Sequence, residues 1–203
     1  MPPETLTAKG RQTRQAIEQA ARKLFAESGF HGTTLADITS AAGKSPAVFY
    51  RYFADKEDLL AALAESFLHE VVRPSGLSVE LPESPDDDSF FTAVVTGYWN
   101  MFKQNIGIMI AVAQLAATQR RFATVQNEFR RFGMDIVAAS VRRAQEQGYG
   151  AELNPQHTAA AIALLFENFT TVFVGPSNLG LEISDQDAVA TLSTIWKKTL
   201  YGA

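Results

Sequence analysis

The side chains in this sequence that are best suited to chemistry lie close together, between residues 33 and 56. Arg51 can donate two hydrogen bonds to the O6 and N7 atoms of a guanine. The hydroxyl of Tyr50 can donate to a phosphate oxygen. Lys44 can extend its charged end to a phosphate or to a base, because a lysine carries its ammonium on a long apolar stem. This mixture of residue types favours a surface that binds nucleic acid.

Two short helices are expected to position these side chains. Thr34 suits the start of the first, because its hydroxyl can accept free backbone N–H groups there. Gly43 permits a tight turn. Ser45 then offers a second capping hydroxyl, and Pro46 begins a helix that we expect to reach about residue 53. Two short helices joined by a glycine turn predict a helix-turn-helix, whose second helix reads the bases.

The charge distribution agrees with this interpretation. The chain of 203 residues has a formal net charge of −4. Residues 9–56, however, hold eight Lys and Arg against four Asp and Glu, whereas residues 74–203 hold nine against thirteen. Phosphate binding requires a local basic surface and not a basic protein. Charge alone does not separate this from chance variation, but its coincidence with the helix-turn-helix favours DNA binding.

Other classes of site are disfavoured by composition. The chain has no cysteine, which excludes disulfides and thiolate metal sites and favours a reducing cytoplasm. His31, His69 and His157 lie too far apart for metal-ligand spacing. We expect no metal and no cofactor. No signal peptide opens the chain, and apolar runs such as 106–117 are too short or too interrupted to span a membrane, so no membrane partner is expected.

Hydrophobic periodicity predicts an all-α protein of about nine helices. The expected helices lie at about 10–28, 34–42, 46–53, 55–71, 87–104, 107–118, 121–147, 155–174 and 184–201. Residues 1–8 are expected to form a mobile arm, and residues 73–88, which contain three prolines and an acidic cluster, a loop. The arginines at 120, 131 and 142 return to one face, which is most simply a solvated face.

Three stretches resemble the DNA-binding domain of the TetR family of bacterial transcriptional repressors. They are ARKLFAESGF at 21–30, TTLADITSAAG at 33–43 and VFYRYFADKEDLL at 48–60. The aromatic run at 49–53, followed by Lys56 and Glu57, is the most specific part. The resemblance covers about residues 14–63, roughly a quarter of the chain. It implies an N-terminal three-helix DNA-binding domain (residues 1–54) and a helical effector-binding and dimerisation domain (residues 55–203), which begins with a linking helix.

The DNA-binding candidates combine the residues above with what the resemblance implies. Lys56 resembles the family's phosphate-binding lysine, and Thr33 and Thr34 are candidates for a second phosphate, although capping alone would explain Thr34. Phe49 and Phe53 are expected in the core. The candidates are Thr33, Thr34, Lys44, Ser45, Pro46, Ala47, Val48, Tyr50, Arg51, Tyr52 and Lys56.

The resemblance also implies an effector cavity in the C-terminal region, which holds nine of the fourteen phenylalanines and both tryptophans. Its aromatic bias suggests a small hydrophobic effector. For most of these aromatics, however, core packing is the favoured interpretation, and Gln114 or Asn168, if buried, would need a hydrogen-bond partner. The pocket candidates are Trp99, Phe102, Met109, Gln114, Phe132, Phe166, Asn168 and Phe169.

Three functions follow as hypotheses. The first is a cytoplasmic, ligand-responsive repressor that binds a palindromic, inverted-repeat operator as a homodimer. The second is a helical small-molecule carrier or enzyme; no convergent polar constellation favours catalysis, so no catalytic residue is assigned. The third is an effector-independent DNA-binding protein, which would have a filled core in place of a cavity.

Overall fold

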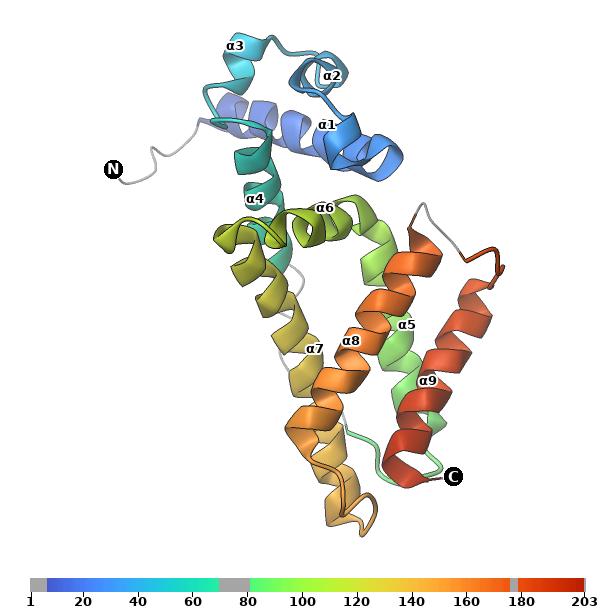
Figure 1. Ribbon diagram of the computed structural model, residues 1–203. Coiled ribbons are helices and arrows are strands. Elements are labelled where there is room, and N and C mark those ends of the chain that lie inside the picture. Colours follow the sequence, from blue (N-terminus) through green and yellow to red (C-terminus); the bar gives the residue numbers. More distant parts are fainter. Residues whose placement is uncertain (1–6, 70–80, 176–178, 203) are drawn as a thin grey trace. The chain divides into compact units, whose positions relative to one another are not determined.

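The computed structural model describes residues 7–69, 81–175 and 179–202, and within them the chain forms nine helices and no strand (Figure 1). This confirms the all-α prediction. The helices are α1 (Ala8–Gly32), α2 (Leu35–Ala41), α3 (Pro46–Phe49), α4 (Lys56–Phe67), α5 (Asp88–Gln104), α6 (Ile106–Ala116), α7 (Arg120–Glu146), α8 (Pro155–Val174) and α9 (Asp185–Tyr201).

Contacts divide the chain into two compact units. The first unit consists of Met1–Phe67 and Gly107–Val125, and the second of Leu68–Ile106 and Gln126–Ala203. The helix-turn-helix and α4 therefore belong to the same unit as most of α6 and the start of α7. The functional boundary expected between residues 54 and 55 stays a prediction.

Helix ends follow the capping residues of the sequence. Asp87 accepts a hydrogen bond from the backbone N–H of Phe90 at the start of α5, and Asn154 accepts from two backbone N–H groups at the start of α8. Gly29 has a φ of 71°, which interrupts α1 and lets Phe30 fold back onto Phe25, with ring centroids 5.3 Å apart.

Two expectations about irregular segments fall at the edge of the described residues. The predicted arm lies largely outside them, but its last two residues are ordered, because the hydroxyl of Thr7 accepts from the N–H of Gly10 and Ala8 begins α1. The first part of the predicted loop at 73–88 lies outside the described residues, and so does the end of the predicted helix at 55–71.

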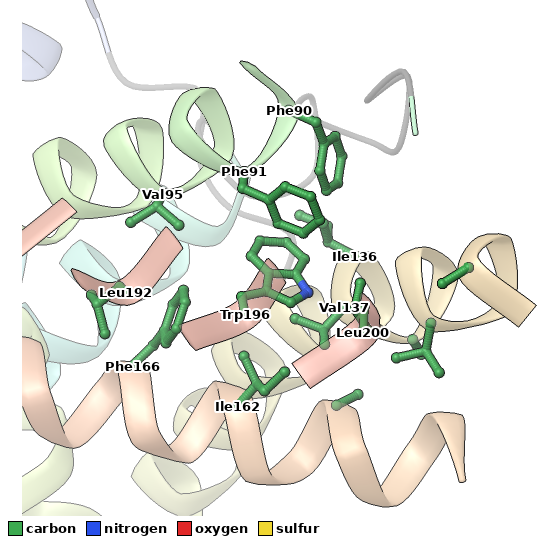
Figure 2. Packing of buried hydrophobic residues seen from close by; sticks show 14 of the residues in the cluster. Phe90, Phe91, Val95, Ile136, Val137, Ile162, Phe166, Leu192, Trp196 and Leu200 are labelled. Atoms are coloured by element: carbon green, nitrogen blue, oxygen red, sulfur yellow. The ribbon is translucent and has the colours of Figure 1, made fainter. Parts of the chain in front are cut away.

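The second unit is built around Trp196 of α9 (Figure 2). Its ring lies 5.2 Å from that of Phe91 and 6.1 Å from that of Phe166, measured between centroids. Its indole N–H donates to the hydroxyl of Ser140 over 3.1 Å. Aliphatic side chains of α5, α7, α8 and α9 fill the space around these rings: Val95, Ile136, Val137, Ile162, Leu192 and Leu200.

Polar contacts fix α9 against α5 at both ends. Asp185, at the start of α9, accepts from the indole N–H of Trp99 over 3.0 Å and from the ammonium of Lys103 over 2.6 Å. Lys197, near the end of α9, contacts Asp88 at the start of α5 over 2.6 Å. The two helices therefore run antiparallel, as Figure 1 shows. Hydrogen bonds from Lys103 and Trp99 lower the pKa of the Asp185 carboxyl.

Helix α8 corrects one expectation about apolar segments. In the part of the chain that the structure describes, it has the length (20 residues) and mean hydropathy (1.3) of a membrane-crossing helix, and 22% of that apolar window is buried. Polar residues such as Glu167 and Asn168 interrupt the apolar runs of α8, but its alanines and large apolar side chains keep the mean hydropathy high. Glu167 in this helix is paired with Arg130 of α7.

Candidate nucleic-acid interface

The start of α2 is closed by a reciprocal cap. The backbone N–H of Thr34 donates to the Asp37 carboxylate over 2.8 Å, and the N–H of Asp37 donates to the Thr34 hydroxyl over 3.2 Å. This is a capping box, which satisfies two donors that a helix start would leave free. Hydrogen bonds from the Thr34 side chain and backbone lower the pKa of the Asp37 carboxyl. Capping thus engages the Thr34 hydroxyl.

Thr33 points into the protein. It is 1% exposed, and its hydroxyl donates to the carbonyl oxygens of Leu24 and Gly29 over 3.2 and 2.8 Å. The residue joins the end of α1 to the start of α2, so its side chain holds the angle between these helices. A contact from Thr33 to a phosphate stays a prediction, and the backbone of Thr33 would have to make it.

Lys56 also serves the corner between α1 and α2. Its ammonium donates to the carbonyl oxygens of Phe30 and Thr33 over 2.6 and 2.7 Å, and lies 4.3 Å from the centre of the Phe30 ring. Burial lowers the pKa of Lys56. An ammonium has three donors, so two are used inside the protein, and the predicted phosphate contact has one donor left.

This arrangement predicts that Lys56→Met destabilises the protein. We expect a loss of about 2 kcal/mol, because two partly buried carbonyl groups lose a charged donor. Lys23→Met is the matched control, since Lys23 is an exposed lysine of α1; its free energy of unfolding should change by less than about 0.5 kcal/mol. Urea denaturation measures both. Equal stability of Lys56→Met and the native chain would show that the two short contacts carry no weight.

The turn after α2 has the geometry for which Gly43 was proposed. Its φ is 62°, a left-handed conformation that favours glycine. The N–H of Gly43 donates to the carbonyl of Ser40, and the N–H of Lys44 donates to that of Thr39 over 2.8 Å. These two bonds form a Schellman motif, which ends α2 and aims the chain at α3.

The recognition helix is shorter than expected, because α3 ends at Phe49 and residues 50–52 continue as turns. Phe49 and Phe53 are buried with ring centroids 5.6 Å apart, as predicted. Pro46 occupies the first helical turn, as expected. Ser45 stands at the N-cap but makes no side-chain capping bond, which corrects its predicted role as a hydroxyl cap.

The remaining candidates form the solvent-facing side of this region. Tyr50 is the most exposed large hydrophobic side chain there, at 60%. Within the described residues, Arg51 makes no ion pair and is free to reach a base. Exposed candidates are Thr34, Ser45, Pro46, Ala47, Tyr50 and Arg51; partly exposed ones are Lys44, Val48, Tyr52 and Lys56. The site thus consists of exposed side chains on a segment that the buried rings of Phe49 and Phe53 hold in place.

Two structural contacts of this unit were missed at the sequence level. The Glu57 carboxylate accepts from the amide of Gln119 over 3.0 Å and from Arg121 over 3.1 Å. Gly107, in the first turn of α6, lies against the backbone of α1: an added Cβ would be 2.5 Å from Ala26 N. No sequence signal identifies partners some sixty residues apart. A glycine early in an apolar helix can indicate a close contact with another backbone. Without such a neighbour, alanine at that position would make the helix more stable.

The pocket candidates divide between the units. Met109 and Gln114 belong to the first and the other six to the second. Trp99, Phe102 and Phe166 are buried, whereas Phe132, Phe169 and Met109 are partly buried. Gln114 and Asn168 are exposed, so neither is a buried polar group. On α8 the buried positions are Phe166 and Thr170, four residues apart, which turns Asn168 away from the interior.

A helix-turn-helix that presents Arg51 and Tyr50 on a basic N-terminal segment is typical of DNA-binding proteins. Comparisons with known proteins agree with this class. The family described as "Bacterial regulatory proteins, tetR family" matches residues 17–63. The transcriptional repressor AcnR of Corynebacterium glutamicum is 41% identical over 68 residues, which are 32% of this chain and 36% of AcnR.

Longer similarities are weaker in identity. The transcriptional regulator EthR of Mycobacterium tuberculosis is 22% identical over 92% of this chain and 86% of EthR. The crystal structure of the regulator FadR from Bacillus subtilis, in complex with stearoyl-CoA, has a TM-score of 0.65 at 20% identity, covering 93% of this chain and 98% of FadR. Residues 17–63 therefore match a TetR-family DNA-binding domain, and over most of its length the chain is similar to transcriptional regulators. The TetR family is a family of regulators and not of enzymes.

Proposed function

We propose that this chain is a cytoplasmic repressor that binds an inverted-repeat operator as a homodimer and is released by a small hydrophobic effector. The observation that carries the proposal is the outward face of the helix-turn-helix. There Tyr50 and Arg51 face solvent, while buried Phe49 and Phe53 hold the segment in place.

The exposed leading turn suits the major groove. Pro46, Ala47 and Val48 offer apolar surface to thymine methyl groups, and Arg51 offers a bidentate donor to guanine. Tyr50 and Lys44 stand beside them for phosphate contacts, which fix register without reading sequence. Thr33 and Lys56 contribute mainly by holding the corner from which these residues project.

A homodimer is supported by apolar surface on α8 and α9. Leu164 is 49% exposed, and Leu165 and Ile195 are exposed as well. Burial of these side chains against a second copy would remove them from water and explain the membrane-like hydropathy of α8. A two-fold pair can hold two recognition helices about one turn of DNA apart, roughly 34–36 Å.

Release by an effector is proposed from the aromatic interior of the second unit and from the similarity to FadR, which was crystallised with stearoyl-CoA. An effector that binds better to the form unable to bind DNA shifts the population toward it. Within the first unit, the contacts of Glu57 and Gly107 tie residues 107–125 to α4 and α1, and we propose that they transmit the shift.

A second candidate is an effector-independent DNA-binding protein. The observation in its favour is that Trp99, Phe102 and Phe166 are all nearly fully buried in packed surroundings. Linkage separates the two functions, because an effector that weakens DNA binding must itself bind more weakly in the presence of operator DNA. A bound apolar ligand that leaves DNA affinity unchanged would favour the second candidate.

Arg51→Ala is expected to weaken binding to a preferred DNA sequence by about 1–3 kcal/mol and to relax the preference at one base pair. Fluorescence anisotropy with a duplex enriched from a random library measures the loss, and single-base variants of that duplex locate it. Arg131→Ala, an exposed arginine of α7, is the control and should change neither value. An equal loss on enriched and random duplexes would make Arg51 a phosphate contact only.

A further inference from the structure

Two buried hydroxyls of the second unit, those of Thr170 and Ser193, have no hydrogen bond of normal geometry among the described residues, and the one of Thr170 lies beside a second donor. Thr170 of α8 is 0% exposed, and its Oγ1 makes no hydrogen bond of normal geometry to any residue that the structure describes. A threonine in a helix can donate to the carbonyl four residues earlier, as the neighbouring Thr171 does to Glu167 over 2.7 Å. Thr170 does not, although an unsatisfied buried polar group costs free energy. Its hydroxyl is available for an incoming acceptor.

A second donor lies beside it, on α5. The phenol of Tyr98 interacts with both the Thr170 hydroxyl and the charge of Glu167, and burial, the largest effect, raises the pKa of Tyr98. The phenol is therefore protonated and able to donate at neutral pH. Its ring packs on the rings of Phe166 and Phe102, at centroid distances of 5.8 and 5.9 Å. Phe166 also contacts Trp196 (Figure 2), so this polar pair borders the aromatic core.

The nearby charges disfavour an anion. The Glu167 carboxylate accepts two hydrogen bonds from Arg130, over 2.6 and 2.9 Å, and one from Gln126 over 3.0 Å. Because Arg130 is committed to Glu167 in a bidentate pair, its charge is neutralised locally. The charge that acts on Tyr98 is the negative one of Glu167. A free carboxylate would find no unpaired positive charge among these groups, whereas a neutral oxygen would meet two donors.

We propose that Thr170 and Tyr98 form the polar end of the effector site and donate hydrogen bonds to one neutral carbonyl oxygen of an otherwise apolar ligand. Ketones, esters and amides with a hydrocarbon chain belong to this class. The inference rests on the proposed release by an effector and specifies the ligand for it. The rings of Phe102 and Phe166 flank the donors and suit the hydrocarbon part.

The ligand-free protein provides the first test. Thr170→Val keeps the shape of the side chain and removes only the hydroxyl. We expect its denaturation midpoint in urea to equal or exceed that of the native chain, since the hydroxyl makes no hydrogen bond of normal geometry and only its weak interaction with the Tyr98 phenol is lost. A clearly lower midpoint would show that the hydroxyl serves the fold, and would overturn the proposal without touching DNA binding.

Three ligands of matched length provide the second test: decan-2-one, decane and decanoate. Quenching of Trp99 and Trp196, the two tryptophans, reports binding. We expect decan-2-one to bind about tenfold more tightly than decane and decanoate to bind more weakly than decan-2-one. Thr170→Val and Tyr98→Phe should each abolish the ketone advantage. Thr171→Val, whose hydroxyl is bonded inside its own helix, should retain it.

The outcomes separate the two proposals. Binding of all three ligands with no ketone preference, or a preference that survives in Thr170→Val, overturns the carbonyl site and leaves the apolar effector intact. Failure of every ligand to bind overturns the apolar effector site, and the carbonyl site with it.

Discussion

Trp196→Ala is expected to lower the free energy of unfolding by about 3–5 kcal/mol, the range for removing a large aromatic from a packed core. Trp196 is 1% exposed and contacts the rings of Phe90, Phe91 and Phe166 (Figure 2). Alanine would leave a cavity at the point where these rings meet. Since a domain is stable by only about 5–15 kcal/mol, much of the stability of the second unit depends on this residue. Guanidinium denaturation measures the loss.

Trp196→Phe is the control for volume. It keeps an aromatic ring in place but removes the N–H that donates to Ser140. The expected loss is about 1–2 kcal/mol, smaller than that of alanine, because the Ser140 hydroxyl still donates to the carbonyl of Val137 over 2.7 Å. If the alanine variant proved as stable as the native chain, Trp196 would not be the centre of this core.

Gly107→Ala is expected to destabilise the protein by about 2–3 kcal/mol. A Cβ there would lie 2.5 Å from both Ala26 N and the carbonyl carbon of Phe25, which are backbone atoms of α1 and cannot rotate away. The helices must separate or strain, as in overpacking of a core. If the contact holds the DNA-binding head, DNA affinity should fall as well, which titration with an enriched duplex measures.

The matched control is the same substitution in another helix. Gly97 of α5 has no atom near the position of an added Cβ, so Gly97→Ala should stabilise the chain by up to about 1 kcal/mol through helix propensity. If the same substitution lowers the stability at Gly107 and raises it at Gly97, the loss at Gly107 comes from the close contact between α6 and α1 and not from helix propensity. Stabilisation by both alanines would contradict the contact between α6 and α1.

Local signals in the sequence predicted the fold well, because helix ends are determined by neighbouring residues. Gly43 forms the turn for which it was proposed, and Asp87 and Asn154 cap the helices that follow them. Ser45 shows the limit of such a signal: it stands at the cap position without making the bond. Residue type predicts where a helix begins more reliably than which atoms close it.

Long-range contacts were beyond the sequence. The bond from Trp99 to Asp185 joins residues 86 positions apart, and Lys56 reaches back 26 residues to the carbonyl of Phe30. A lysine in a basic segment suggests phosphate binding, yet the carbonyl groups that face Lys56 depend on how α1 meets α2. The exposure of Asn168 follows from its position in the helical register. Its neighbours in the sequence are mostly apolar, and they wrongly suggested that it is buried.

Selection of duplexes from a random DNA library by the full chain tests the central claim most directly. Sequencing identifies the enriched site, and the mass of the complex gives the number of chains bound to it. The account predicts an inverted repeat whose half-sites are centred about 10–10.5 base pairs apart, or a multiple of that spacing, bound by two-fold pairs of the chain. No enriched sequence, or an asymmetric site bound by a single chain, would contradict it.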